Sequence, residues 1–266
     1  MKFAPVLFLV IATLVAPATA EIETREVEYP AGDVTAKGFL AMPEGKGPHP
    51  GVLVVHEWWG ANDYVRDRAR QLAGMGYVAL AVDMYGDGKI AGHPKDAGTF
   101  AMLVKNNQKL MQERFLGAME FLKTQEASDN EHIAAIGYCF GGNVVLQMAR
   151  NGLEGLDGVA SFHGALGLRK PQGDNKPTAK VLVCNGADDG FIPAKDITAF
   201  KKTMEEAGMT YSFHNYEGAV HGFTNPDADK FGEKFGLPLA YNEEADKKSW
   251  AELTKFLEEL FARNEE

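Results

Sequence analysis

The sequence predicts an α/β fold in which a mostly parallel, twisted sheet carries helices on both faces. Short apolar runs of strand length alternate with longer segments that have helical spacing. Some of these runs, such as residues 51–57 and 180–186, are almost continuously apolar, as expected of strands buried on both faces. Polar and glycine-containing loops follow the runs, and the carboxyl ends of parallel strands gather such loops at one edge of a sheet.

The first half of the chain opens with two β-rich runs, residues 24–30 and 36–43, punctuated by Gly and Pro. We expect them to form an antiparallel hairpin or meander. A buried strand over residues 51–57 follows, and then a helix over residues 63–76 that is closed by glycine. The run 77–85 predicts another buried strand.

The second half begins with helical spacing over residues 94–125, where Asn106 and Asn107 weaken the middle and favour two helices. Three strands are expected next, at 132–138, 158–164 and 180–186. A helix beginning near Gly142 follows the first of these strands, and a helix beginning near Pro193 follows the third. A last strand at 211–218 and an amphipathic helix at 243–262 complete the chain's predicted elements. Residues 167–176 and 224–239 are candidate lids, but the spacing of their apolar residues does not decide whether they are.

Residues 1–20 have the three parts of a secretory signal peptide: Lys2, an apolar run, and the small residues Ala18-Thr19-Ala20 as a cleavage site. A membrane anchor is the alternative, but the apolar run is short and contains Pro5. We expect cleavage before Glu21 and an exported protein, periplasmic or secreted, with no later membrane span. Without repeats or long linkers, residues 21–266 are expected to form one domain.

The composition, 45% hydrophobic and 24% charged, is that of an ordinary globular protein. A net charge of −10 argues against a nucleic-acid partner, which would favour a basic face. The two cysteines permit one disulfide but no disulfide framework, and Cys184 lies in a predicted strand, as a core thiol would. We expect a small-molecule partner and a monomer or dimer.

Cys139 lies in the pattern Gly137-x-Cys-x-Gly141, directly after an apolar run. This pattern is typical of a nucleophile elbow, a strained strand-to-helix turn that projects its side chain from the sheet. Glycines are needed there because the turn leaves no room for Cβ atoms near the nucleophile. The dipole of the following helix would favour a thiolate. A short pattern of this kind is weak evidence by itself, and most free cysteines are core residues.

Two downstream residues strengthen the interpretation. Asp189 follows a predicted strand in GADDGFIP, and His221 follows the last strand in EGAVHGFTNP. Nucleophile, acid and histidine then occur in the order of the α/β-hydrolase fold. His221 would take the thiol proton, and Asp189 would orient the imidazole. Asp188 is an alternative acid, and Asp189 could instead cap the next helix.

The loop after the first buried strand, HEWWG at residues 56–60, would supply one oxyanion-hole N–H, and the residue after the nucleophile the other. This assigns the backbone amides of Trp58 and Phe140. A zinc motif would need histidine at Gly60, no other spacing suggests a metal, and no nucleotide-binding motif occurs, so we expect no metal and no cofactor. The side chains of Trp58, Trp59, Tyr85 and Phe223 are candidates for an apolar substrate pocket or for the core.

These motifs together resemble the dienelactone hydrolase family, a cysteine branch of the α/β-hydrolases. The resemblance runs from about residue 52 to the last helix and is carried by HEWWG, VDMYG, GYCFGG, GADDGFIP and VHGF. It implies a triad of Cys139, Asp189 and His221. It also implies that Glu57 helps generate the thiolate, which a carboxylate with a raised pKa can do, although Glu57 could be only a structural acceptor.

The sequence departs from the family at two places. Family members that act on dienelactone bind its carboxylate with two arginines, and here those places hold Asp87 and Asn225. Neither can supply bidentate recognition of a carboxylate. We therefore expect hydrolysis of a small ester or lactone through an acyl-thioenzyme, with the substrate unassigned.

Three rival interpretations remain. The strongest is an exported, non-catalytic small-molecule-binding protein on the hydrolase fold. A glutamine amidotransferase-like enzyme would carry His-x-Glu, whereas Gly222 and Phe223 follow His221. A serine-type peptidase is disfavoured by the cysteine and by the absence of an extra domain.

Overall fold

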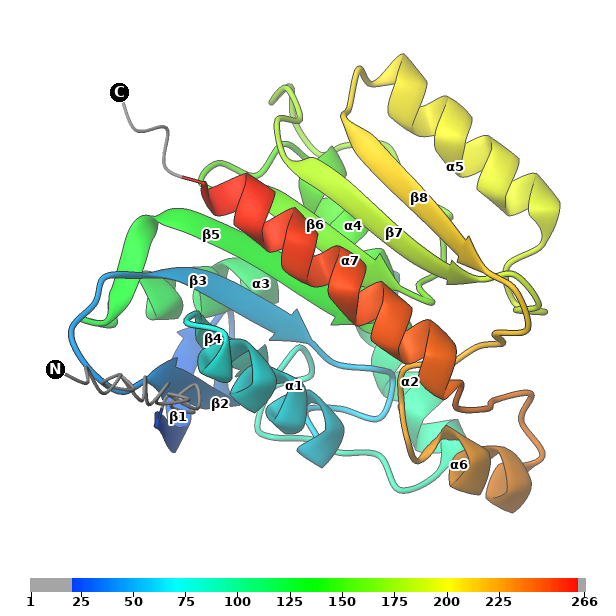
Figure 1. The fold of residues 1–266 in the computed structure, drawn as a ribbon, viewed down its shortest axis with the longest axis horizontal. Coiled ribbons are helices and arrows are strands. Elements are labelled where there is room, and N and C mark those ends of the chain that lie inside the picture. Colours follow the sequence, from blue (N-terminus) through cyan, green and yellow to red (C-terminus); the bar gives the residue numbers. More distant parts are fainter. Residues whose placement is uncertain (1–20, 263–266) are drawn as a thin grey trace, which may run out of the picture.

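Eight strands form one sheet in the spatial order β1-β2-β4-β3-β5-β6-β7-β8 (Figure 1). The computed structural model describes residues 21–262, so the predicted signal peptide lies outside the described residues. The strands are β1 (Ile22–Ala31), β2 (Val34–Pro43), β3 (His49–Val55), β4 (Val78–Val82), β5 (Ser128–Tyr138), β6 (Gly158–Phe162), β7 (Lys180–Gly186) and β8 (Tyr211–Tyr216).

The sheet is parallel from β4 to β8 and antiparallel at one edge. β3 pairs in parallel with both β4 and β5, and β5 to β8 pair in parallel in sequence order. β1 and β2 form an antiparallel hairpin, and β2 joins the sheet antiparallel to β4. The predicted mostly parallel sheet with an antiparallel opening is therefore confirmed.

Helices cover both faces of the sheet, because successive side chains of each buried strand point to opposite faces. Val52 and Val54 of β3 belong to the same hydrophobic cluster as α1 and α7, whereas Leu53 and Val55 belong to the cluster of α3, α4 and α5. The helices are α1 (Asp63–Gly74), α2 (Pro94–Lys105), α3 (Gln108–Lys123), α4 (Phe140–Arg150), α5 (Ala194–Glu206), α6 (Ala228–Phe235) and α7 (Glu243–Phe261).

The break between α2 and α3 falls at Asn106 and Asn107, as predicted. Asn107 caps α3, since its side chain accepts a hydrogen bond from the N–H of Leu110 (3.1 Å). The helix α6 was not predicted from the sequence. It spans only eight residues, and its place is set by tertiary packing of Phe231 on Trp59, with ring centroids 4.7 Å apart.

Figure 1 shows α2 and α6 at the carboxyl ends of the strands, where the loops carrying the predicted site residues also lie. Contacts agree with this placement, because Phe100 of α2 packs on Tyr85 of the loop after β4 (5.5 Å between ring centroids). Within residues 21–262, no helix is both long enough and apolar enough to cross a membrane.

Candidate active site

Cys139 forms the turn between β5 and α4, with φ at 52°. This positive φ is unusual for a residue with a side chain and strains the backbone. A Cβ on Gly137 would lie 2.2 Å from the carbonyl oxygen of Gly141, and a Cβ on Gly141 would lie 2.3 Å from that of Val55. The two glycines therefore allow the first turn of α4 to approach the end of β3.

His221 and Asp189 lie together at the carboxyl end of β7, joined by a 2.8 Å hydrogen bond between His221 Nδ1 and Asp189 Oδ2. The Asp189 side chain is completely buried, and its other oxygen accepts a hydrogen bond from the N–H of Phe191 (2.9 Å). Asp188, the alternative acid, is exposed. The geometry therefore pairs Asp189 rather than Asp188 with the histidine.

The electrostatics around His221 favour its charged form. Burial by itself would lower the pKa of His221, but the charge of Cys139 and the hydrogen bonds with Asp189 and Cys139 outweigh burial and raise the pKa to about 10. The rings of Phe191 and His163 each contact the imidazole edge to face, with centroids 5.0 and 5.2 Å away. These contacts limit the orientations that the His221 ring can adopt.

His56 connects the loop after β3 to its neighbours. The N–H of Met84 donates to His56 Nε2 (3.3 Å), so Nδ1 carries the proton and donates to the carbonyl oxygen of Glu57. The His56 carbonyl accepts a hydrogen bond from the N–H of Gly141 (3.1 Å), and its ring stacks on Phe140. This buried side chain thus fixes both segments that carry the predicted oxyanion-hole amides.

Those amides belong to Trp58 and Phe140. Among residues 21–262, neither backbone N–H is matched with a hydrogen-bond acceptor, whereas the N–H of Cys139 donates to the carbonyl of Phe162 (3.0 Å). Phe140 is the first residue of α4, where backbone N–H groups have no acceptor within the helix. Two amide donors are therefore available beside the nucleophile turn.

Glu57 is buried at the same end of the sheet. In the part of the chain that the structure describes, its carboxylate accepts a hydrogen bond from Asn225 Nδ2 (2.6 Å) and none from Cys139. Burial raises the pKa of Glu57 to about 7, although the Asn225 hydrogen bond and the charges of His221 and Arg68 favour the carboxylate. Glu57 can therefore exchange a proton near neutral pH.

Of the four side chains considered for an apolar pocket, those of Trp59, Tyr85 and Phe223 are largely buried, and that of Trp58 is half-buried. Phe223 has no exposed surface and packs in the core against His163 and Tyr216, which corrects its assignment to a substrate pocket. Trp59 is also a packing residue, held against α6. Tyr85 is the exception, because it lines a cavity and donates a hydrogen bond from its hydroxyl to the carbonyl of Trp58 (2.9 Å).

Three residues at this site make contacts that the sequence did not predict, although Asn225 was noted for occupying the place of a family arginine. Asn225 contacts Glu57, His163 contacts His221 and Phe191 contacts both His221 and Asp189. Each follows a strand at the carboxyl edge of the sheet, which is the only sequence signal that could have pointed to them. Asn225 and Glu57 are 168 positions apart, so no local pattern could identify their contact, whereas Phe191 lies only 2 positions after its partner Asp189.

The two places where the family has arginines hold no free cation. Asn225 is engaged with Glu57, and Asp87 forms an exposed ion pair with Lys89 (2.9 Å). His163 cannot replace an arginine, because burial and the charge of His221 lower the pKa of His163 well below its ordinary value. A substrate carboxylate would find no buried positive partner at these positions.

Both cysteines are free, so the disulfide that the count permitted is not formed. Cys184 is fully buried in β7, and burial raises the pKa of its thiol to about 12. Within residues 21–262, no group of three or more His, Cys, Asp or Glu side chains is arranged to hold a metal ion.

Comparisons with known proteins show which proteins the chain resembles. A family model described as the dienelactone hydrolase family matches residues 36–261. Protein usf of Aquifex pyrophilus is 27% identical over 203 residues, which cover 75% of this chain and 86% of that protein. A putative carboxymethylenebutenolidase of Aquifex aeolicus is 28% identical over 205 residues, with the same shares covered.

Among solved structures, a dienelactone hydrolase-like promiscuous phosphotriesterase from metagenomic libraries superimposes with a TM-score of 0.82 and 32% identity. The match covers 90% of this chain and 98% of that one. The similarity therefore extends across the whole sheet and its helices, beyond the motifs around the site.

Proposed function

The chain belongs to the dienelactone hydrolase family, and on that premise we propose that it hydrolyses small uncharged esters or lactones through an acyl-thioenzyme on Cys139. Membership in the family makes the protein an ester or lactone hydrolase. The observation that carries the finer proposal is the buried 2.8 Å contact between His221 and Asp189 beside the strained turn at Cys139.

In the proposed first step, the sulfur of Cys139 attacks the carbonyl carbon of the ester and His221 holds the thiol proton. The carbonyl oxygen becomes an oxyanion, which the N–H groups of Trp58 and Phe140 stabilise. The bond to the alkoxy oxygen then breaks, and His221 gives its proton to the leaving alcohol. A thioester remains on Cys139; with a lactone, the alcohol stays attached to the acyl group.

In the second step, His221 takes a proton from water, and the resulting hydroxide attacks the thioester. The carboxylic acid leaves, and the proton returns to the sulfur of Cys139. Asp189 keeps the imidazole in one orientation and stabilises its charged form throughout. Glu57 is the second group able to hold the thiol proton, because burial brings its pKa to about 7.

The proposed substrates are uncharged because positions 87 and 225, where family members that act on dienelactone have arginines, hold Asp87 and Asn225. When Glu57 is ionised, it adds negative charge at this end of the sheet, which disfavours a substrate carboxylate. A neutral phosphotriester is a second candidate class, favoured by the 32% identity with the promiscuous phosphotriesterase and by the same lack of cations. There the sulfur would attack phosphorus, with an alkoxide or aryloxide as the leaving group.

The test is single-turnover cleavage of 4-nitrophenyl acetate, followed by intact-mass analysis, for the wild type and Cys139→Ala. We expect a nitrophenolate burst and an acetyl adduct on Cys139, both absent from the variant. Cys184→Ala serves as the matched control and should keep both. Equal background release from all three proteins, without an adduct, would favour the non-catalytic binding protein instead.

We also propose export, based on the signal-peptide pattern of residues 1–20. Expression of the full chain in a bacterium with an outer membrane, followed by fractionation and amino-terminal sequencing, tests it. The expected result is a periplasmic or secreted protein that begins at Glu21. An uncleaved protein in the cytoplasm would contradict export and leave the catalytic proposal unaffected.

A further inference from the structure

A cavity of about 620 Å³ lies between the loop after β4, the second half of α2 and the start of α3. Its volume falls within the range of about 300–1,000 Å³ that is usual for small-molecule sites. Its apolar wall is formed by Tyr85, Phe100, Met102, Leu103 and Leu110. We call it the α2 groove.

The α2 groove contains unusually exposed apolar side chains. Among residues 21–262, four large hydrophobic residues are exposed, and two of them line the groove: Met102 at 52% and Leu103 at 64% exposure. Apolar side chains left in water forgo the stabilisation that burial would give. Apolar surface gathered in a concave site is typical of a ligand-binding groove.

The groove adjoins the candidate active site through Tyr85. On one side the Tyr85 ring packs on Phe100 of the groove, and on the other it packs on His56 and Phe140, with centroids 4.6 and 5.5 Å away. Burial raises the pKa of Tyr85, and the nearby charge of Cys139 adds to this effect. A single aromatic side chain therefore contacts both the groove and the surroundings of the nucleophile.

The charged groups of the groove are already engaged. Arg114 donates hydrogen bonds to the carbonyl of Ala31 and to Asp33, and Lys89 is paired with Asp87. An anionic ligand would have to compete with Asp33 and Asp87 for these two side chains. An aliphatic chain would instead cover Leu103 and Met102 without disturbing a charge.

We propose that the α2 groove binds the aliphatic chain of the ester substrate, extending from the ester bond at Cys139 past Tyr85. This inference rests on the proposed function and narrows its substrates to esters with a hydrophobic chain. The chain can belong to the acyl or to the alcohol side of the ester, and the two arms of the experiment distinguish them.

The experiment measures kcat/KM for 4-nitrophenyl acetate, butyrate, hexanoate and octanoate in one arm, and for ethyl, butyl, hexyl and octyl acetate in the other. We expect kcat/KM of the wild type to rise with chain length in one arm. Leu103→Gln, a surface change of similar size, should lower kcat/KM for the longest ester of that arm about tenfold and leave the shortest within about twofold.

Ile90→Gln is the matched control, because Ile90 is 53% exposed but does not line the groove. It should leave the chain-length preference unchanged. The groove proposal is overturned if wild type and Leu103→Gln show the same chain-length profile, or if Ile90→Gln changes the profile as much. If the wild type cleaves no ester, both the proposed function and the groove proposal are overturned. If it cleaves esters through Cys139 but Leu103→Gln does not change the chain-length preference, only the groove proposal is overturned.

Discussion

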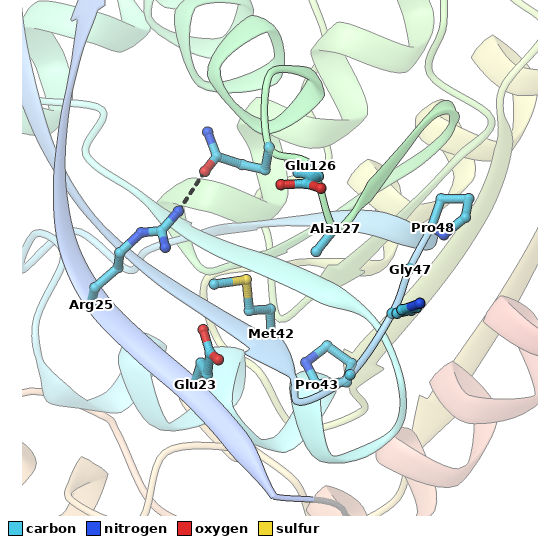
Figure 2. Close-up of a pocket in the computed structure, with 11 residues that line it drawn as sticks. Glu23, Arg25, Met42, Pro43, Gly47, Pro48, Glu126 and Ala127 are labelled. Atoms are coloured by element: carbon cyan, nitrogen blue, oxygen red, sulfur yellow. Dashed lines mark hydrogen bonds between the residues drawn. The ribbon is translucent and has the colours of Figure 1, made fainter.

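The amino and carboxyl ends of the parallel strands differ in whether the polar side chains there are exposed or buried. At the amino end, a cavity of about 600 Å³ lies between β1, the loop before β3 and the segment before β5 (Figure 2). Its charged side chains are all exposed: Glu23, Arg25, Lys46 and Glu126. The hydrogen bond drawn in Figure 2, from Arg25 to Gln125 (2.7 Å), is also exposed.

The carboxyl end holds buried polar groups that are paired with one another. Glu57 and Asp189 are both buried, and each has a hydrogen-bonded partner. Among residues 21–262, the three non-glycine residues with positive φ also lie here: Asp87, Cys139 and His163. They follow β4, β5 and β6.

The candidate active site is therefore distinguished by buried polar groups and backbone strain, and the volume of a cavity does not identify it. Burying a polar group and straining the backbone both cost free energy, so they persist where other interactions compensate for them. The exposed charges of the amino end carry no such cost. The following predictions test this distinction, beginning with the residue whose change should matter most.

Replacing Cys139 by glycine should separate turnover from stability. Ester turnover should fall at least about 10³-fold, because no nucleophile remains. The free energy of unfolding should rise by about 1 kcal/mol relative to Cys139→Ala, because glycine adopts φ of 52° without strain. Chemical denaturation and steady-state kinetics measure the two quantities.

Asp87→Gly is the matched control for strain, since Asp87 has φ of 58° and an exposed side chain. It should gain stability like Cys139→Gly but keep ester turnover. Loss of turnover in Asp87→Gly, or equal stability of Cys139→Gly and Cys139→Ala, would contradict the interpretation of the strained turn.

Asp189→Asn should lower kcat about 10²–10⁴-fold, because the amide favours the wrong orientation or tautomer of His221. KM should change far less than kcat. Asp188→Asn, at the exposed neighbour, should keep kcat within about twofold. Similar losses in both variants would show that the acid has been assigned to the wrong carboxylate.

His56→Phe should lower kcat about 10–100-fold through misplacement of the oxyanion-hole amides, because phenylalanine keeps the ring but loses both hydrogen bonds. Phe200→Leu, a change at a buried residue of α5, controls for a general loss of stability. If Phe200→Leu loses kcat equally at a temperature where both proteins are folded, His56 has only a structural role.

Asn225→Arg should shift the pH dependence of kcat/KM. In the wild type, Glu57 is protonated below its pKa of about 7 and ionised above it, so activity should rise as the pH increases through this value. A guanidinium beside the carboxylate lowers its pKa, and the rising limb should move at least about one unit toward lower pH. A limb that stays in place in both Asn225→Arg and Glu57→Gln would exclude Glu57 from the proton transfer.

Arg25→Ala, at the amino end, should have the smallest effect. Its hydrogen bond is exposed, so the free energy of unfolding should change by less than about 0.5 kcal/mol and ester turnover by less than about twofold. A large loss of turnover would mean that the amino-end cavity takes part in the function, and the contrast between the two ends would fail.

Much of the architecture could be predicted because it depends on local patterns. Continuous apolar runs such as residues 180–186 identify strands buried on both faces, and the break at Asn106 and Asn107 identifies a helix boundary. The helix α6 could not be predicted in this way. It is short, and contacts with Trp59 rather than its own propensity hold it in place.

The mostly parallel sheet, the elbow pattern around Cys139 and the order of the predicted nucleophile, acid and histidine could be inferred from the sequence, because periodicity and turn chemistry are local properties. Three features are visible only in the folded protein: Asp189 rather than Asp188 contacts His221, Asn225 donates a hydrogen bond to Glu57, and Phe223 belongs to the core. These are contacts between strand ends far apart in the chain. Burial and pairing arise when the sheet brings those ends together, and no local pattern encodes them.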